Sequence, residues 1–316
     1  MCALSMNSIF LLTVELLNFH SLQSDLVNHC CSFPLRQHVR SLVVLCLCCR
    51  LRMSAEENPA AEPAPVIDVQ GDGRWMSQHN RFVQECKDAE PDVLFVGDSM
   101  VQLMQQYEVW RELFSPLHAL NFGVGGDTTC NVLWRLQNGE LDNIRPRVRK
   151  RFFFICSNSF NSICYEVKCV FNAGIAFLFV FPQVVVLWVG TNNHEHTADQ
   201  VAGGILAIVQ LLLSRLPKCK IIVLGLLPRG EFPNPLREKN AAVNNLLRTS
   251  LPQLGPVQLI DVGGGFVHSD GTISSRDMFD FLHLTASAYR TISTSLHELL
   301  LQLLEETPQE RRASLV

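Results

Sequence analysis

The chain has 316 residues, with 26 Lys and Arg, 30 Asp and Glu, and a formal net charge of −4. This length allows one large domain or two small ones, and a slightly acidic chain lacks the basic surface on which nucleic-acid binding depends. No segment reaches the roughly 18 consecutive apolar residues of a membrane-spanning helix. We therefore expect no nucleic-acid partner and no transmembrane segment.

The 12 cysteines are distributed unevenly. Six precede Met53 and three lie within 147–182, so the rest of the chain holds only Cys86, Cys130 and Cys219. A secreted disulfide framework would spread its cysteines through the domain, and the sequence contains no Asn-x-Ser/Thr site for glycosylation. We therefore expect a reducing, cytoplasmic location.

The first 52 residues differ in composition from those that follow. They are apolar and cysteine-rich without a sustained period, and they lack the basic region and cleavage site of a signal peptide. From Met53 the composition changes to Ala, Glu and Pro. We interpret 1–52 as a low-order extension upstream of the natural initiator Met53. We expect 53–72 to be a flexible arm that is disordered over 54–65.

Apolar periodicity then predicts helices and short buried strands in alternation. Before residue 147 the pattern gives a helix at 74–85, a strand at 93–97, a helix over 99–114, a strand at 118–124 and a helix from about 128. After residue 183 it gives strands at 184–190, 220–227 and 257–262, and helices at 197–216, 236–251 and 285–304. This order predicts the α/β class, a three-layer α/β/α sandwich with a flavodoxin-like five-stranded parallel sheet. One domain comprises 73–146 and 183–306, and 307–316 is a tail.

The segment 147–182 interrupts this regularity. It holds eight of the 19 phenylalanines and no consistent period, and it separates two pieces that would otherwise join as a short helix-to-strand connection. Val148-Arg149-Lys150 can be encoded by a splice-donor-like run, and residues 177–183 by a pyrimidine tract ending in CAG. We interpret the segment as a retained intron, with a genuine lineage-specific loop as the alternative.

Three candidate functional segments directly follow predicted strands. They are Gly97-Asp98-Ser99, Gly125-Gly126 and Thr191-Asn192-Asn193, and a fourth, Asp280-x-x-His283, precedes the last helix. Because the carboxyl ends of parallel strands meet at one edge of a sheet, these residues are expected to lie together. Serine needs a histidine base oriented by a carboxylate, and acyl transfer needs N–H donors for an oxyanion. The pattern indicates a serine hydrolase.

Each of these residues also has a purely structural interpretation. Asp98 or Ser99 could cap the following helix, and Asp280 could cap the last one. Gly125 and Gly126 could serve a tight turn, Asn192 could be a turn residue, and His283 could be structural. A single site explains all four segments together.

The four segments resemble the sequence blocks of the GDSL/SGNH hydrolase family. More closely, 53–146 and 183–316 resemble the α-subunit branch of the intracellular type I platelet-activating factor acetylhydrolases, on the α2-type runs Gly97-Asp-Ser-Met-Val-Gln-Leu-Met-Gln-Gln-Tyr107 and Phe279-Asp-Phe-Leu-His-Leu-Thr285. Gly190-Thr-Asn-Asn193 stands where the wider family often has Gly-x-Asn-Asp, which matches this branch. Residues 1–52 and 147–182 have no counterpart in this branch.

The resemblance implies a role for each candidate residue. Ser99 would be the nucleophile, His283 the base and Asp280 the orienting acid, and the oxyanion donors would be the N–H groups of Ser99 and Gly126 with the Asn192 amide. It implies an esterase that removes the sn-2 acetyl group of platelet-activating factor-like phospholipids without a metal or organic cofactor. It also implies homodimers, or heterodimers with a sister α subunit, and a WD40 β-propeller partner, the dynein-associated protein linked to lissencephaly.

Other interpretations remain open at this stage. Met100 and Leu282 flank the nucleophile and the base, and we expect them to limit the acyl pocket. His194, Glu195, His196 and Asp199 could form a metal site, although a polar pocket rim is the favoured interpretation, and His268-Ser269-Asp270 is expected to be a turn. The functional alternatives are a non-catalytic scaffold subunit and an esterase for a different small acyl group.

Overall fold

The computed structural model describes residues 58–88, 91–142, 144, 147–151, 176–180 and 184–305. The chain divides into two units, Met1–Met53 and Ser54–Val316, and every described residue lies in the second. The interpretations of 1–52 as an upstream extension and of 307–316 as a tail therefore fall outside the described residues, as does most of the 147–182 segment.

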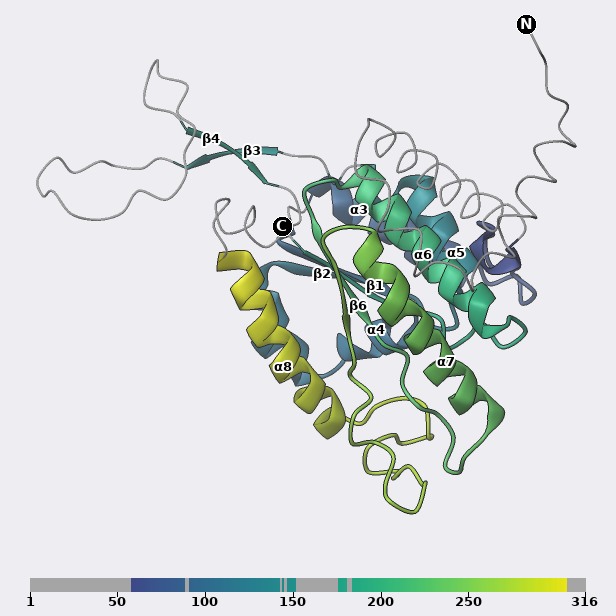
Figure 1. The fold of residues 1–316 in the computed structure, drawn as a ribbon. Coiled ribbons are helices and arrows are strands. Elements are labelled where there is room, and N and C mark those ends of the chain that lie inside the picture. The colour runs from purple at the N-terminus through teal and green to yellow at the C-terminus, as the bar shows by residue number, and fades with distance from the viewer. Residues whose placement is uncertain are drawn as a thin grey trace, which may run out of the picture. The chain divides into compact units, whose positions relative to one another are not determined.

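A five-stranded parallel sheet lies at the centre of the described part of the chain (Figure 1). Its strands are β1 (Val93–Gly97), β2 (Ala119–Gly123), β5 (Val184–Trp188), β6 (Lys220–Leu224) and β7 (Val257–Ile260). They are arranged in the order β2-β1-β5-β6-β7, and every pairing is parallel. This is the flavodoxin-like strand order, so the predicted fold class is confirmed.

The α-helices of the described residues alternate with the strands of this sheet along the chain. They are α3 (Arg74–Asp88), α4 (Ser99–Met104), α5 (Thr129–Arg135), α6 (Ala198–Arg215), α7 (Pro235–Ser250) and α8 (Ala286–Glu305). Shorter helical turns cover Pro59–Ala61, Trp110–Phe114, Ser115–Leu117, Leu136–Glu140 and Leu251–Gln253. Apart from the helix expected over 99–114, the predicted elements are present, with ends that differ by a few residues.

The single helix expected over 99–114 is wrong. Helix α4 ends at Met104, and a separate helical turn forms at Trp110–Phe114. Met104, Trp110 and Phe114 nevertheless belong to the same apolar cluster. Two short segments packing on one side of the sheet therefore produce the apolar period of one helix.

Alternate residues of β1 face opposite layers of the sandwich. Leu94 and Val96 pack in a cluster that includes residues of α3, α5, α6 and α7. Val93 and Phe95 pack in a second cluster that includes residues of α4 and α8. Because both faces of the strand are covered, all of its residues are buried, which explains an uninterrupted apolar run in place of alternation.

The segment before α3 is packed, so the expectation of a disordered arm over 54–65 is wrong for its described part. The Nδ2 of Asn58 donates to the Gln200 carbonyl at 2.9 Å, and the Oγ1 of Thr129 donates to the Ala60 carbonyl at 2.6 Å. Ala60 is fully buried. An Ala/Pro-rich composition does not reveal these partners, which lie far away in sequence.

Two strands within 147–182 form a separate antiparallel pair. They are β3 (Arg147–Arg151) and β4 (Ala176–Val180), and they do not join the five-stranded sheet. The sequence showed no period there, so these strands were not expected. The side chains of both strands, and the rest of the segment, fall outside the described residues.

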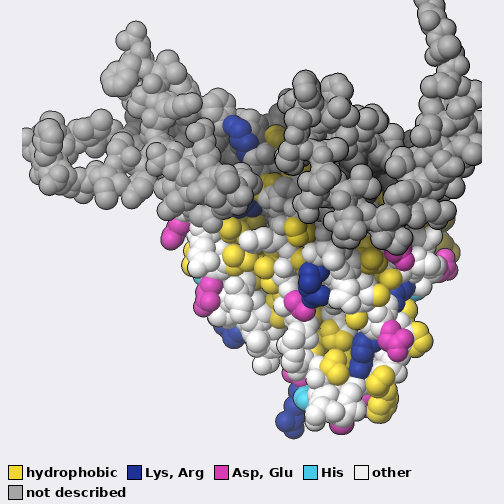
Figure 2. All heavy atoms as spheres, in the orientation of Figure 1, with side chains coloured by type: hydrophobic (Ala, Val, Ile, Leu, Met, Phe, Trp, Pro, Cys, Tyr) yellow, Lys and Arg dark blue, Asp and Glu magenta, His cyan; other side chains and the backbone are white. Residues whose placement is uncertain are grey.

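In Figure 2, acidic and basic side chains are interspersed across the described part of this face. No helix among the described residues is long and apolar enough to cross a membrane.

Candidate active site

The nucleophile candidate occupies a tight turn between β1 and α4. Strand β1 ends at Gly97, Asp98 is the N-cap of α4, and Ser99 is its first residue. The Oδ1 of Asp98 accepts a hydrogen bond from the Met100 N–H at 2.9 Å, so the capping interpretation is correct for Asp98. A Cβ at Gly97 would lie 2.0 Å from the Trp188 carbonyl oxygen. Only glycine allows the turn to begin there.

Ser99, His283 and Asp280 form a continuous line of contacts. The Oγ of Ser99 lies 2.9 Å from Nε2 of His283, and Nδ1 of His283 lies 2.6 Å from Oδ2 of Asp280. Ser99 and His283 are 184 positions apart in the chain. The fold therefore brings together the candidate nucleophile, base and orienting acid that the sequence paired only by residue type.

The carboxylate of Asp280 holds the turn that carries Asp280 and His283. The Oδ1 of Asp280 accepts hydrogen bonds from the N–H groups of Leu282 at 3.1 Å and His283 at 2.7 Å. Phe281 adopts a φ of 60°, in the left-handed region. Since α8 begins only at Ala286, Asp280 orients this turn and does not cap the helix.

The charge of Asp280 determines which nitrogen of His283 carries the proton. Partial burial acts to raise the pKa of Asp280, but hydrogen bonds from the His283 N–H, the His283 ring and the Leu282 N–H outweigh burial and lower the pKa. An ionised carboxylate only accepts hydrogen bonds. Nδ1 of His283 must therefore donate to Asp280, and this tautomer leaves Nε2 free to accept the Ser99 proton.

The oxyanion-donor candidates follow neighbouring strands at the same edge of the sheet. Gly97 is in register with Gly123 of β2 and Trp188 of β5, which brings Ser99 beside the residues that follow those strands. A Cβ built on Gly125 would lie 3.9 Å from the Ser99 Cβ. The Gly125-Gly126 turn therefore flanks the nucleophile.

The candidate donors differ in how they are already used. The Gly125 N–H donates to the Gln102 Oε1 at 3.0 Å. Gly126 has a φ of 85°, and its N–H has no hydrogen-bond acceptor among the described residues. The Nδ2 of Asn192 donates to the Asp127 carbonyl at 3.0 Å, which leaves its second hydrogen available.

A buried ionic network beneath this site was not predicted from the sequence. Arg135 is fully buried; its Nε donates to Asp127 Oδ2 at 2.7 Å and its Nη1 to Glu140 Oε2 at 2.6 Å. Its Nη2 donates to the carbonyls of Gly97 at 3.3 Å and Phe122 at 3.1 Å. Arg135 therefore joins the turn before Ser99 to the residue after Gly126.

One sequence signal could have indicated this network. Arg135 follows the apolar residues Val132 and Leu133 and precedes Leu136, and all three are buried. A charged side chain at such a position is rarely buried unless it is paired. The partner could not be deduced, because Asp127, Glu140 and two backbone carbonyls were equally available in the sequence.

The expected pocket residues differ in position. Leu282 is partly buried and lines a cavity of about 500 Å³ with Arg229, Gly230, Asp280 and Phe281. Met100 is 3 % exposed and packs in the core with residues of α8. Met100 is thus a core residue behind the nucleophile, and it lines neither the Leu282 cavity nor the cavity at Gly125 and Gly126.

Arg229 is a further charged residue of the site that the sequence did not single out. Its Nη1 donates to the Thr191 carbonyl at 2.8 Å. Burial lowers its pKa, and the charges of Asp280 and Asp98 act in the opposite direction. It therefore places a cation beside the orienting carboxylate and the loop of Asn192.

The segment from His194 to His196 is held by backbone contacts. The Nζ of Lys239 donates to the carbonyls of Asn193 at 2.8 Å, His194 at 3.1 Å and His196 at 3.1 Å. Among the described residues, no group of three or more His, Cys, Asp or Glu side chains is arranged to hold a metal ion. The alternative pair at His268 and Asp270 lies in an exposed turn in which the Gly271 N–H donates to the His268 carbonyl at 2.9 Å.

The fold and the site define the class of protein. The chain belongs to the GDSL-like Lipase/Acylhydrolase family, whose pattern matches residues 95–291, and it is a carboxylic ester hydrolase. A GDSL-like lipase from Bacteroides thetaiotaomicron shares the fold at a TM-score of 0.51 with 15% identity, covering 71% of this chain and 97% of that one.

Curated relatives are much more similar in sequence. The chain is 62% identical over 260 residues to the human platelet-activating factor acetylhydrolase IB subunit alpha2, an alignment that covers 82% of this chain and 98% of that protein. It is 55% identical over 254 residues to the human alpha1 subunit, covering 80% of this chain and 94% of that one. The predicted resemblance to this branch is confirmed.

Proposed function

We propose that this chain hydrolyses the sn-2 acetyl ester of platelet-activating factor-like phospholipids through Ser99, His283 and Asp280. The observation that carries the proposal is the line of contacts at 2.9 Å and 2.6 Å between these three side chains. The acetylhydrolase names of the similar curated proteins support the choice of acyl group.

The proposed reaction begins with proton transfer from Ser99 to His283. Nε2 of His283 takes the proton from Oγ, and Oγ attacks the ester carbonyl. The resulting oxyanion accepts hydrogen bonds from the N–H groups of Ser99 and Gly126 and from the free amide hydrogen of Asn192. Asp280 stabilises the imidazolium ion through Nδ1.

The second half of the reaction returns the enzyme to its starting state. Nε2 of His283 gives its proton to the alcohol oxygen as the ester bond breaks, which leaves Ser99 acetylated. Water then enters, and its oxygen attacks the acetyl carbonyl as Nε2 of His283 removes its proton. The tetrahedral intermediate collapses as Nε2 returns the proton to the Ser99 Oγ, which releases acetate and restores free Ser99. No step requires a metal or organic cofactor.

The assembly and location are also part of the proposal. The similar proteins are named as subunits, which supports homodimers or heterodimers with a sister α subunit. A WD40 β-propeller protein is the proposed regulatory partner. No disulfide joins the described cysteines, Cys86, Cys130 and Cys219, in keeping with the proposed cytoplasmic location.

Serine labelling with a fluorophosphonate probe tests the nucleophile. Ser99→Ala should abolish labelling and lower acetate release on the order of 10⁴-fold or more. Ser287→Ala, at an exposed serine of α8, is the matched control and should retain both. Circular dichroism should show all three proteins folded. Labelling that persists in Ser99→Ala would remove Ser99 from the mechanism, and a folded but unlabelled native chain would favour the scaffold alternative.

A further inference from the structure

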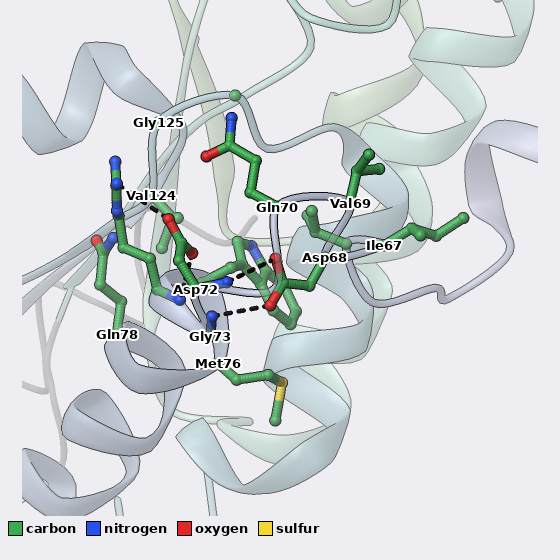
Figure 3. Close-up of a pocket in the computed structure, with 14 residues that line it drawn as sticks. Ile67, Asp68, Val69, Gln70, Asp72, Gly73, Met76, Gln78, Val124 and Gly125 are labelled. Atoms are coloured by element: carbon green, nitrogen blue, oxygen red, sulfur yellow. Dashed lines mark hydrogen bonds and ion pairs between the residues drawn. The ribbon is translucent and has the colours of Figure 1, made fainter.

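A cavity of about 390 Å³ opens beside the candidate oxyanion donors. Gly125 and Gly126 form part of its wall, and the segment from Val66 to Met76 forms much of the rest. Figure 3 shows residues 67–73 curling beside the Val124–Gly125 turn. Because a Cβ on Gly125 would lie 3.9 Å from the Ser99 Cβ, the cavity begins next to the nucleophile.

In the segment from Val66 to Met76, the carboxylate side chains stabilise the local backbone turn. Oδ1 of Asp68 accepts a hydrogen bond from the Gly71 N–H at 2.8 Å, and Oδ2 accepts one from the Gly73 N–H at 2.8 Å. Both glycines have a positive φ, 70° and 61°, which other residues adopt only with strain. Asp72 pairs with Arg74 at 3.0 Å. The carboxylates are therefore engaged inside the turn.

The apolar side chains of the segment from Val66 to Met76 are largely exposed to solvent. Val66 and Met76 are each 38% exposed, Ile67 is 83% exposed and Val69 is 88% exposed. They account for half of the large apolar side chains exposed among the described residues. An exposed apolar group of this kind beside a catalytic site indicates a ligand contact.

Two connections tie this cavity to the oxyanion turn. The Nε2 of Gln102 donates to the Gln78 Oε1 at 2.9 Å, and the Gln102 Oε1 accepts from the Gly125 N–H at 3.0 Å. Independently, the Nε1 of Trp75 donates to Asp127 Oδ1 at 2.7 Å. Gln78 and Trp75 both line the cavity. Hydrogen bonds therefore link two lining residues to the Gly125-Gly126 turn and to Asp127, which follows it.

We infer that this cavity binds the apolar chain of the ester's alcohol portion. The inference rests on the proposed function, in which the acyl group is acetyl and needs space for one methyl group. A cavity of about 300–1,000 Å³ accommodates a much larger ligand, and the only other part of the substrate is the alcohol. Val66, Val69 and Met76 are the residues that would contact its chain.

Acetate esters of straight-chain alcohols, from ethanol to decanol, test the assignment below their micellar concentrations. In the native chain, kcat/KM for acetate release should rise with the length of the alcohol. In the double variant Val66→Ser/Val69→Ser it should fall about tenfold for decyl acetate, the usual effect of losing apolar pocket contacts, and stay unchanged for ethyl acetate. Val267→Ser, at a valine that is 41% exposed and outside the cavity, should match the native chain.

A binding measurement separates this inference from the proposed function. Calorimetry should detect decanol binding to Ser99→Ala, with loss of binding when Val66→Ser/Val69→Ser is added. Ester hydrolysis without dependence on alcohol length, or a dependence that survives the double variant, overturns the inference alone. Decanol binding at these valines without any hydrolysis overturns the proposed function and supports the apolar-chain site.

The oligomeric state is measured in parallel by sedimentation. If Val66→Ser/Val69→Ser converts a dimer to a monomer, these side chains contact a second copy, and the inference is overturned. An unchanged state, together with the loss of length dependence, supports it. A rate that depends on the acyl chain and not on the alcohol also overturns it, because the cavity would then hold the acyl group.

Discussion

The side-chain amide of Asn192 donates a hydrogen bond to the backbone carbonyl of Asp127 across 3.0 Å. The carboxylate of Asp127 in turn accepts from Arg135 Nε and from Trp75 Nε1, each at 2.7 Å. The orientation of the candidate oxyanion donor is therefore linked to a buried ion pair through Asp127.

Two neighbouring asparagines should show different effects when replaced by alanine. Asn192→Ala should lower kcat about 10²–10³-fold, the usual loss for one oxyanion donor, with little change in the denaturation midpoint. Asn193 is buried and bonds both the N–H of Thr129, at 3.1 Å, and its Oγ1, at 2.9 Å. Asn193→Ala should instead lower stability by about 1–3 kcal/mol. Steady-state kinetics and urea titration measure both; a change in KM alone for Asn192→Ala would make it a binding residue.

Removal of the buried arginine should be strongly destabilising. Arg135→Met leaves Asp127 and Glu140 without their shared cation, and breaking a buried pair in this way costs about 3–5 kcal/mol. Urea denaturation followed by circular dichroism measures the loss. Arg111→Met is the control, because Arg111 pairs with Glu108 on the surface, and it should change stability by less than about 1 kcal/mol. Equal stability of the two variants would contradict the role given to Arg135.

Burial of Asp98 predicts a dependence of stability on pH. Desolvation, opposed by the Met100 hydrogen bond and assisted by the charge of Asp127, raises the pKa of Asp98 to about 7 from 3.8. The folded state therefore holds a proton that the unfolded state has released between these values, so this contribution to stability is complete below the unfolded pKa and is lost as the pH rises through about 7.

Asp98→Asn tests this contribution directly. The variant keeps a side-chain acceptor for the Met100 N–H but cannot ionise. Its free energy of unfolding should therefore fall less than that of the native chain between pH 4 and pH 7. Denaturant titrations across this range measure both curves. Parallel curves would show that Asp98 is not the titrating group.

A chain in which Pro146 is joined to Gln183 should retain the active site. The segment 147–182 precedes Val184, which pairs with Val93 at the amino end of β1, whereas the candidate site lies at the carboxyl end. The deletion removes eight phenylalanines, and exposed apolar residues promote association. Fluorophosphonate labelling should persist, and the soluble fraction on expression should rise. If the deletion loses labelling while the full chain is equally soluble, the retained-intron interpretation is wrong.

The local pattern was sufficient for the sheet and for the candidate triad residues. Each strand is a short apolar run because both of its faces are covered, and this signal depends only on adjacent residues. The same holds for the Gly97-Asp98-Ser99 turn and for Asp280 with His283, since each group lies within four positions. The parallel sheet brings the residues after β1, β2 and β5 to one edge. Asp280 and His283 lie in a turn between β7 and α8, so their approach to Ser99 depended on how that turn packs.

The partners of individual side chains depended on the tertiary structure. Arg135 reaches the Gly97 carbonyl across 38 positions, and Thr129 reaches Ala60 across 69. Composition suggested a disordered arm where the described chain is packed, and the position next to Ser99 suggested a pocket residue at Met100, which lies in the core. Periodicity indicates which face of an element is buried, because that follows from backbone geometry. Which groups meet on that face is decided only when distant elements pack together.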